Sequence, residues 1–178
     1  MKLRDLVKNL EMLECTAPLD AEIKGVSYDS RMTRPGDLFV AIKGFETDGH
    51  RFIRKAMERG AVAVLCEDAP ADGTPYIRIA DCRLGLAYVS RELFGNPAKR
   101  MTLIGITGTS GKTTSSYLIK HMLETKLGAK VGLIGTNGNM IGDELAHSEH
   151  TTPESYELNK LFAAMADAGC THVVMEVS

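Results

Sequence analysis

Ile104-Gly105-Ile106-Thr107-Gly108-Thr109-Ser110-Gly111-Lys112-Thr113-Thr114 is the stretch that decides the fold of this chain. It follows a short apolar run and precedes residues with helical spacing, which is the order strand, glycine-rich loop, helix. Glycines let the backbone approach a phosphate chain, and the N–H groups and dipole of the following helix favour an anion. The stretch therefore predicts a phosphate-binding loop formed by Gly108, Thr109, Ser110, Gly111, Lys112, Thr113 and Thr114.

The two residues of this loop with the clearest chemistry are Lys112 and Thr113. The lysine can reach terminal phosphates and the threonine hydroxyl can bind Mg²⁺, so both are candidate catalytic residues. The strict pattern would need glycine at position 106, where this chain has Ile106. The alternative is a tight turn with an exposed lysine. The strand before, the helix after and the three glycines at 105, 108 and 111 favour phosphate binding, with ATP as the expected ligand.

The composition is that of an ordinary globular protein. The 178 residues are 44% hydrophobic and 25% charged, and the net charge of −2 gives no general basic surface for nucleic acid. No apolar run approaches the roughly 18 residues of a membrane span, so no membrane insertion is expected. The scattered cysteines, expected to be small core residues in a reducing cytoplasm, are Cys15, Cys66, Cys82 and Cys170.

Periodicity and turn residues predict an α/β fold in two domains, with a boundary at Gly95-Asn96-Pro97. In residues 1–97 we expect helices at 2–13, 50–59 and 84–94 and strands at 23–28, 38–42, 61–66 and 75–79. In residues 98–178 we expect strands at 101–106, 130–135 and 172–177, separated by helices at 112–126 and 154–168. Alternating strands and helices predict a parallel sheet in this second part, with ligands at the carboxyl ends of its strands.

The last expected strand ends in Glu176. An acid at the end of an apolar strand near a phosphate loop is a candidate Mg²⁺ ligand, together with Thr113. The alternative is a glutamate that faces solvent.

A second helix start lies at Thr152-Pro153-Glu154, where Thr152 is a good N-cap residue and Pro153 suits the first helical position. The segment is either a capped helix alone or a place where hydroxyl and N–H groups hold a polar substrate. His147, His150, Cys170 and His172 lack the spacing of a zinc site, and we expect structural or solvated roles for them.

Several segments together resemble the Mur ligase family. They are Asp29-Ser30-Arg31, Gly36 to Ala41, Asp48-Gly49-His50, the phosphate loop, Thr151-Thr152-Pro153-Glu154-Ser155 and Met175-Glu176-Val177-Ser178. The last two segments are similar to those of the family member that adds the third residue of the peptide. Ser110 and His150 stand where the family often has asparagine.

The resemblance implies an ATP-dependent, Mg²⁺-dependent ligase of peptidoglycan precursor synthesis. Such an enzyme adds meso-diaminopimelate or L-lysine to UDP-MurNAc-L-Ala-D-Glu through an acyl phosphate, as a cytoplasmic monomer. By resemblance, residues 1–97 bind the UDP-MurNAc portion and residues 98–178 begin the ATP-binding domain. The implied substrate-binding residues are Ser30, Phe45, Glu46, Thr47, Thr151, Thr152 and Ser178.

The same resemblance implies that the family's carbamylated lysine and amino-acid-binding domain lie beyond Ser178. We therefore expect a fragment that does not complete the ligation. Two other functions stay open at this point. One is a P-loop kinase or NTPase with an unrelated N-terminal addition, and the other is a non-catalytic module that binds a nucleotide or a UDP-sugar.

Overall fold

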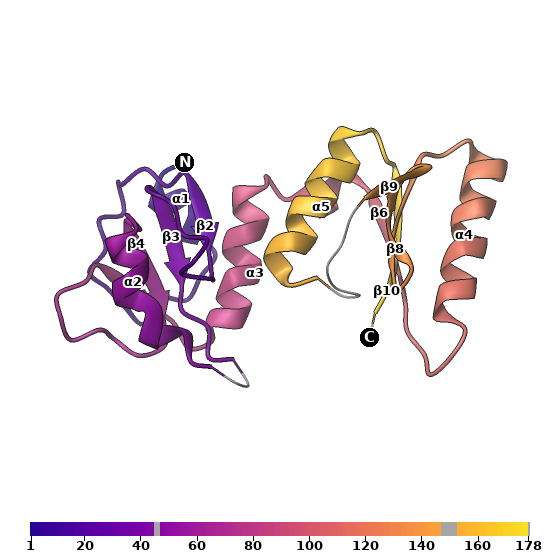
Figure 1. Cartoon of the computed structure of the whole chain (residues 1–178). Coiled ribbons are helices and arrows are strands. Elements are labelled where there is room, and N and C mark those ends of the chain that lie inside the picture. The colour runs from indigo at the N-terminus through magenta and orange to yellow at the C-terminus, as the bar shows by residue number, and fades with distance from the viewer. Residues whose placement is uncertain (45–46, 147–152, 178) are drawn as a thin grey trace. The chain divides into compact units, whose positions relative to one another are not determined.

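The computed structural model describes residues 1–44, 47–146 and 153–177. The chain divides into two compact units, Met1–Leu93 and Phe94–Ser178 (Figure 1). Among the residues that the structure describes, none of the helices combines the length and the apolar character that a bilayer crossing requires.

The first unit is built on a five-stranded sheet with the order β1-β5-β4-β3-β2. Strands β2 to β5 pair in parallel, and β1 pairs antiparallel to β5 at the edge. The strands are β1 (Glu14–Cys15), β2 (Gly25–Ser27), β3 (Asp37–Val40), β4 (Ala63–Cys66) and β5 (Tyr76–Arg78). Both β3 and β4 are buried along their whole length, and apart from Asp37 at the start of β3 their residues are apolar, as expected for strands covered on both faces.

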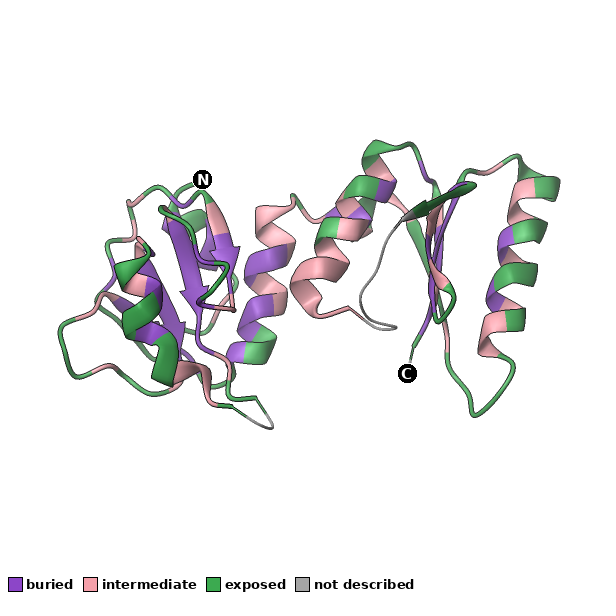
Figure 2. Cartoon of the chain, viewed as in Figure 1, coloured by how far each residue is buried: buried purple, intermediate pink, exposed green. Residues whose placement is uncertain are grey.

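Helices cover both faces of this first sheet (Figure 2). One face packs on α2 (Ile53–Glu58), which follows the 3₁₀ helix η1 (Gly49–Phe52), and Phe39 and Val64 lie in that core with Ala56. The other face packs on α3 (Cys82–Leu93), which also contacts α1 (Leu3–Val7). A β-carbon at Gly85 of α3 would lie 2.9 Å from Leu65 Cδ2, so this glycine lets α3 approach the sheet closely.

The second unit has a five-stranded sheet with the order β6-β10-β7-β8-β9. The strands are β6 (Thr102–Ile106), β7 (Val131–Gly135), β8 (Gly138–Ile141), β9 (Glu144–Ala146) and β10 (His172–Glu176). Strand β10 lies between β6 and β7 and is parallel to both. Strands β8 and β9 continue the sheet as an antiparallel hairpin.

Two helices lie on opposite faces of the second sheet, α4 (Lys112–Leu127) and α5 (Ser155–Asp167) (Figure 1). Alternate residues of β10 pack on the two faces of the sheet. Val173 packs in a core with Phe162 and Met165 of α5, whereas Val174 packs in a core with Ile119 and Leu123 of α4. The unit opens with the 3₁₀ helix η2 (Pro97–Arg100), which contacts α5.

The α/β fold class is confirmed, but the second sheet is mixed rather than wholly parallel. The β8–β9 hairpin was not predicted, because its strands are only four and three residues long. Gly138, with φ of +105°, lies at the turn between β7 and β8, and Gly142, with φ of +61°, lies in the turn between β8 and β9. An unbroken helix over residues 2–13 is also wrong, since α1 ends at Val7. The backbone of Leu13 instead donates to the Arg78 carbonyl at 2.8 Å, which draws the following residues into β1 at the sheet edge.

The four cysteines are free thiols and do not share one environment. Cys66, Cys82 and Cys170 are buried as expected, but Cys15 is exposed on the edge strand β1, so the expectation is wrong for this residue. Burial raises the pKa of Cys66 to about 11 and also raises the pKa of Cys82 and of Cys170. At neutral pH the three buried thiols are therefore protonated and shielded.

We expect one fast-reacting thiol per folded chain when an aromatic disulfide reagent is added at pH 8. Cys15→Ser should abolish the fast phase, and denaturant should release all the remaining thiols. The control is Cys82→Ser, in which the fast phase should persist. Two or more fast thiols in the native wild-type chain would contradict the burial of the other cysteines.

Candidate functional site

The loop between β6 and α4 has the backbone that a phosphate-binding loop requires. Gly111 has φ of +76° and is the N-cap of α4, and Gly108 has φ of +151°. A β-carbon on Gly111 would meet no atom within 4 Å, so its role is the left-handed conformation rather than space. The exposed loop thus leads into the positive end of a 16-residue helix.

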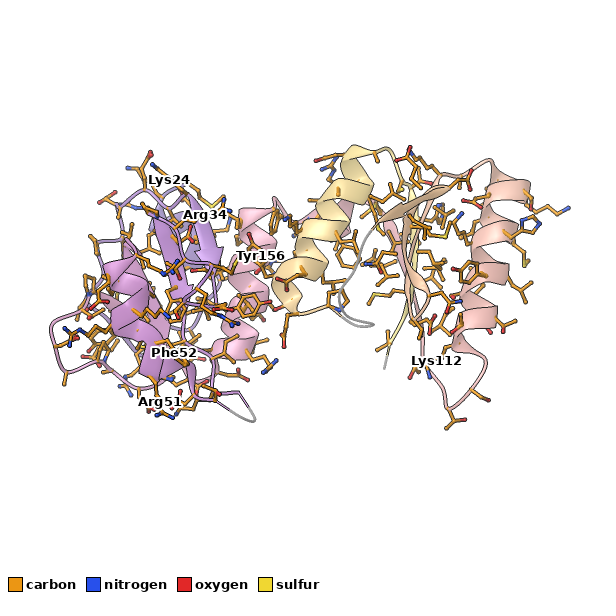
Figure 3. The ribbon with its side chains drawn as sticks, viewed as in Figure 1. Lys24, Arg34, Arg51, Phe52, Lys112 and Tyr156 are labelled. Carbon is orange, nitrogen blue, oxygen red and sulfur yellow. The ribbon has the colours of Figure 1, made fainter. Side chains whose placement is uncertain are left out.

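Lys112 is the first residue of α4, and its side chain folds back over the loop. Its Nζ donates to the Gly108 carbonyl at 2.7 Å. Figure 3 shows Lys112 at the end of α4 that joins the loop. An ammonium group held against the loop's own backbone lies where it can bind an anion enclosed by that loop.

Glu176 lies at the carboxyl end of β10, directly beside the start of α4. Its side chain is only 2% exposed, so the solvent-facing alternative is wrong. The Thr113 hydroxyl donates to Glu176 Oε2 at 3.2 Å, although the two residues are 63 positions apart in the chain. The Thr136 hydroxyl donates to the same oxygen at 3.0 Å, and the Thr136 backbone N–H donates to Oε1 at 3.3 Å.

The oxygen atoms around Glu176 fit a magnesium ion. Within residues 1–44, 47–146 and 153–177, no lysine or arginine forms an ion pair with this buried carboxylate. Its partners are neutral donors, and a buried charge is costly without a counter-charge. A carboxylate and a hydroxyl at the start of a phosphate-binding helix are the donors that Mg²⁺ uses with nucleotides.

Several of the residues expected at a substrate site cannot be placed. Phe45, Glu46, Thr151, Thr152 and Ser178 lie outside the described residues, as do His147 and His150. The expected N-cap at Thr152 is wrong, because α5 begins at Ser155 with Glu154 at its N-cap.

The first unit contains a cleft of about 500 Å³ at the carboxyl ends of β2 and β3. Two of the expected substrate residues, Ser30 and Thr47, line it. The cleft is also lined by Tyr28, Asp29, Arg31, Ile42, Gly49, Phe52 and Lys55. Figure 3 shows Phe52 and Arg51 at one end of this unit, and Lys24 and Arg34 at the other.

An ion pair orients the guanidinium group in this cleft. Arg31 Nε lies 3.0 Å from Asp29 Oδ1, and its Nη2 lies 2.7 Å from Oδ2. Hydrogen bonds from Arg31 hold the pKa of Asp29 below its usual value, against the opposing effect of partial burial, and nearby Lys55 adds to the lowering. Arg31 and Lys55 therefore give the cleft two cationic groups, one of them fixed by its partner.

A histidine fixes the loop that follows β3. His50 Nδ1 lies 2.7 Å from Asp48 Oδ1, while His50 Nε2 accepts the backbone N–H groups of Glu67 at 3.0 Å and Asp68 at 3.2 Å. Nε2 therefore carries the lone pair, and Nδ1 carries the proton that it donates to Asp48.

Asp48, His50 and Asp68 also bring their ligand atoms within 4.8 Å of one another, close enough to suggest a cation site. The tautomer argues against it, because both ring nitrogens are already used. The hydrogen bonds that the backbone N–H groups of Glu67 and Asp68 donate to His50 Nε2 would have to break before a metal could bind there. We assign the cluster a structural role.

Sequence reasoning missed two residues that the fold brings to these sites, Thr136 and Lys55. Thr136 follows the apolar strand β7 and reads as an ordinary turn residue, and Lys55 reads as an exposed residue of an amphipathic helix. Only the tertiary fold brings these two residues to the candidate sites. The pair Gly135-Thr136 at the end of a buried strand is the one signal that could have indicated Thr136.

Two family models match the chain. One, described as "Mur ligase family, catalytic domain", matches residues 22–94, and the other, "Mur ligase middle domain", matches residues 106–178. The chain belongs to the Mur ligase family. Because the matches cover both units, the first unit of this Mur ligase chain is no unrelated addition to a P-loop domain.

Two curated relatives of this Mur ligase chain carry the name UDP-N-acetylmuramoyl-L-alanyl-D-glutamate–2,6-diaminopimelate ligase. The protein of that name from Bacteroides fragilis is 44% identical over 181 residues, and that from Clostridium tetani is 42% identical over 183 residues. Each alignment covers 100% of this chain but only 37% and 38% of the relative. The chain thus spans little more than a third of the length of the relatives it matches.

Solved structures of ligases also match all or most of this chain and about a third of their own length. A structure with the same ligase name matches 100% of this chain and 36% of its own, with a TM-score of 0.82 and 26% identity. A MurF ligase from Thermotoga maritima, solved in complex with ADP, matches 88% of this chain and 32% of its own, with a TM-score of 0.54 and 26% identity.

We expect His50→Ala to lower the free energy of unfolding by about 1–3 kcal/mol, because it leaves two backbone N–H groups without their acceptor. Arg51→Ala, at the exposed neighbouring position, is the control and should change it by less than about 0.5 kcal/mol. Urea unfolding of the three proteins measures this. Stabilisation of the wild-type chain by Zn²⁺, lost in His50→Ala, would instead make the cluster a metal site.

Proposed function

We propose that this chain forms the UDP-substrate-binding and nucleotide-binding parts of an ATP-dependent ligase that adds a diamino acid to UDP-MurNAc-L-Ala-D-Glu. The names of the curated relatives favour 2,6-diaminopimelate over L-lysine as the diamino acid. The structural observation that carries the proposal is the contact between Thr113 and Glu176. This contact supports a candidate metal-binding pair beside the proposed phosphate-binding loop, which ATP-dependent chemistry requires.

In the second unit, the residues proposed to bind ATP are those of the loop from Gly108 to Thr114. Lys112 would bind the terminal phosphates, and Thr113 and Glu176 would hold Mg²⁺. When bound, ATP would supply the phosphoryl group that activates a carboxylate, with Mg²⁺ offsetting its charge. The contribution of the chain is positioning and charge stabilisation: α4 directs its N–H groups at the phosphates, and Lys112 adds a positive charge.

In the first unit, the cleft is proposed to bind the uridine diphosphate portion of the substrate. Arg31 and Lys55 supply two cations for a diphosphate, and Ser30 and Thr47 supply hydroxyl groups for polar atoms. Phe52, 39% exposed, offers an aromatic surface for a planar or apolar group. This assignment rests on charge and shape, and it agrees with the resemblance for Ser30 and Thr47. For Phe45, Glu46, Thr151, Thr152 and Ser178 the substrate role rests on the resemblance alone.

A non-catalytic binding module is the second candidate function. It shares both proposed sites and differs only in whether the bound groups react. The ligase name of the curated relatives favours the ligase, whereas Glu176 would serve a module that binds a nucleotide with Mg²⁺ equally well.

The first test concerns the nucleotide. Lys112→Ala should weaken the binding of ADP in excess Mg²⁺ at least about tenfold, because it removes a charge-assisted contact to the phosphates. Lys126→Ala, an exposed lysine in the last turn of the same helix, is the matched control and should bind ADP as the wild-type chain does. Isothermal titration calorimetry measures both. Equal affinities for all three proteins would remove Lys112 from the site.

The second test concerns the cleft. Lys55→Gln should weaken the binding of UDP by several-fold, and the loss should shrink as salt rises, because the contact is between charges. Lys24→Gln removes the same charge at the other end of the unit (Figure 3) and should leave UDP binding unchanged. Saturation-transfer NMR with titration of UDP measures the affinities. The same loss in both variants would indicate a general charge effect and no specific site.

A further inference from the structure

The Glu176 carboxylate is held by more than the residue that would share a metal with it. Among the described residues it has three hydrogen-bond donors, of which one is the Thr113 hydroxyl and the other two belong to Thr136. Thr136 contacts both carboxylate oxygens, with its N–H on Oε1 at 3.3 Å and its hydroxyl on Oε2 at 3.0 Å. It thereby limits both the position and the rotation of the carboxylate group.

The end of β7 leaves the space that this arrangement needs. A β-carbon on Gly135 would lie 2.4 Å from Glu176 Oε1, a distance that no real β-carbon tolerates. Gly135 therefore lets the glutamate side chain lie across the end of β7, where the next residue can reach it. Strand β7 pairs with β8 through Gly135 and Gly138, and this close hairpin turn carries Thr136.

A bound cation would affect the hydrogen bonds that Thr113 and Thr136 donate to Glu176 in different ways. Thr113 Oγ1 and Glu176 Oε2 are the two proposed ligand atoms, and an ion between them would replace the hydrogen bond that joins them now. The bonds from Thr136 approach the carboxylate from the turn after β7 and can persist. Second partners of this kind orient ligating carboxylates and tune their affinity for metals.

We propose that Thr136 is a positioning residue, which holds the Glu176 carboxylate where it can share a divalent cation with Thr113. The proposal rests on the proposed nucleotide site. It adds that the turn after β7, which the phosphate-loop pattern does not include, sets the affinity for the cation. Thr136 itself is exposed, so replacing it removes no core packing.

The test compares Thr136→Val, which keeps the shape but loses the hydroxyl, with Thr136→Ser, which keeps the hydroxyl. The binding of ADP is titrated by calorimetry in excess Mg²⁺ and again in EDTA. Thr136→Val should reduce the Mg²⁺-dependent gain in ADP affinity by about tenfold, as for other second partners of metal ligands, and leave the affinity in EDTA unchanged. Thr136→Ser should restore the gain.

Thr125→Val is the matched control, because the Thr125 hydroxyl bonds only backbone carbonyls of its own helix, those of His121 and Met122. It should behave as the wild-type chain in both titrations. An unchanged Mg²⁺-dependent gain in Thr136→Val would overturn the proposal. So would parallel losses in EDTA, in Mg²⁺ and in melting temperature, since these indicate a structural role only.

A second measurement requires no nucleotide. In a crystal structure of Thr136→Val, Glu176 Oε2 should move out of hydrogen-bond distance of the Thr113 hydroxyl, and in Thr136→Ser it should stay. An unmoved carboxylate in Thr136→Val overturns the positioning role. Absence of ADP binding by the wild-type chain, with the carboxylate displaced as expected, would instead contradict the proposed function and leave the positioning role supported.

Discussion

The second unit depends on a buried carboxylate at which three separate segments of the chain meet. Glu176 is 2% exposed and belongs to β10, while its donors come from α4 and from the turn after β7. Burying a charged group is costly unless hydrogen bonds or counter-charges compensate it. The contact is therefore satisfied only when the helix, the turn and the strand all take their native places. Glu176, a proposed metal ligand, therefore also helps to fix the native packing of the helix, the turn and the strand.

Strand order makes this contact possible. Strand β10, the last in sequence, lies between β6 and β7, so its carboxyl end emerges beside the phosphate loop and beside the β7 turn at once. Parallel strands place their carboxyl ends at the same edge of a sheet. The first unit follows the same rule independently, since its cleft lies at the carboxyl ends of β2 and β3. In each unit the candidate site lies at the carboxyl ends of adjacent parallel strands.

The sequence predicts what is local and strongly patterned. The loop with its glycines, the apolar strands and the long helix α4 all follow from short stretches read alone, and the placement of β6 before α4 follows with them. It does not predict what depends on register. The role of Thr136 depends on its contact with a carboxylate 40 positions away, and that of Lys55 depends on its place beside the residues that follow β2. Neither the hairpin of β8 and β9 nor the early end of α1 is predicted from the sequence. In both places, pairing with neighbouring strands outweighs a weak local preference.

The two proposed sites also differ in the pairing of their acidic residue: Asp29 in the cleft forms an ion pair with Arg31, whereas Glu176 has no cationic partner among the described residues. The cleft of the first unit offers Arg31 and Lys55, so an anion can bind there directly. At the phosphate loop, Glu176 opposes the positive end of α4 and Lys112, and a phosphate chain near it meets a like charge. A divalent cation reverses that relation by turning the carboxylate into a ligand. Nucleotide and cation should then each favour the binding of the other, since coupling between two ligands is reciprocal. The acid that hinders the nucleotide alone is what makes the site selective for the nucleotide together with its metal.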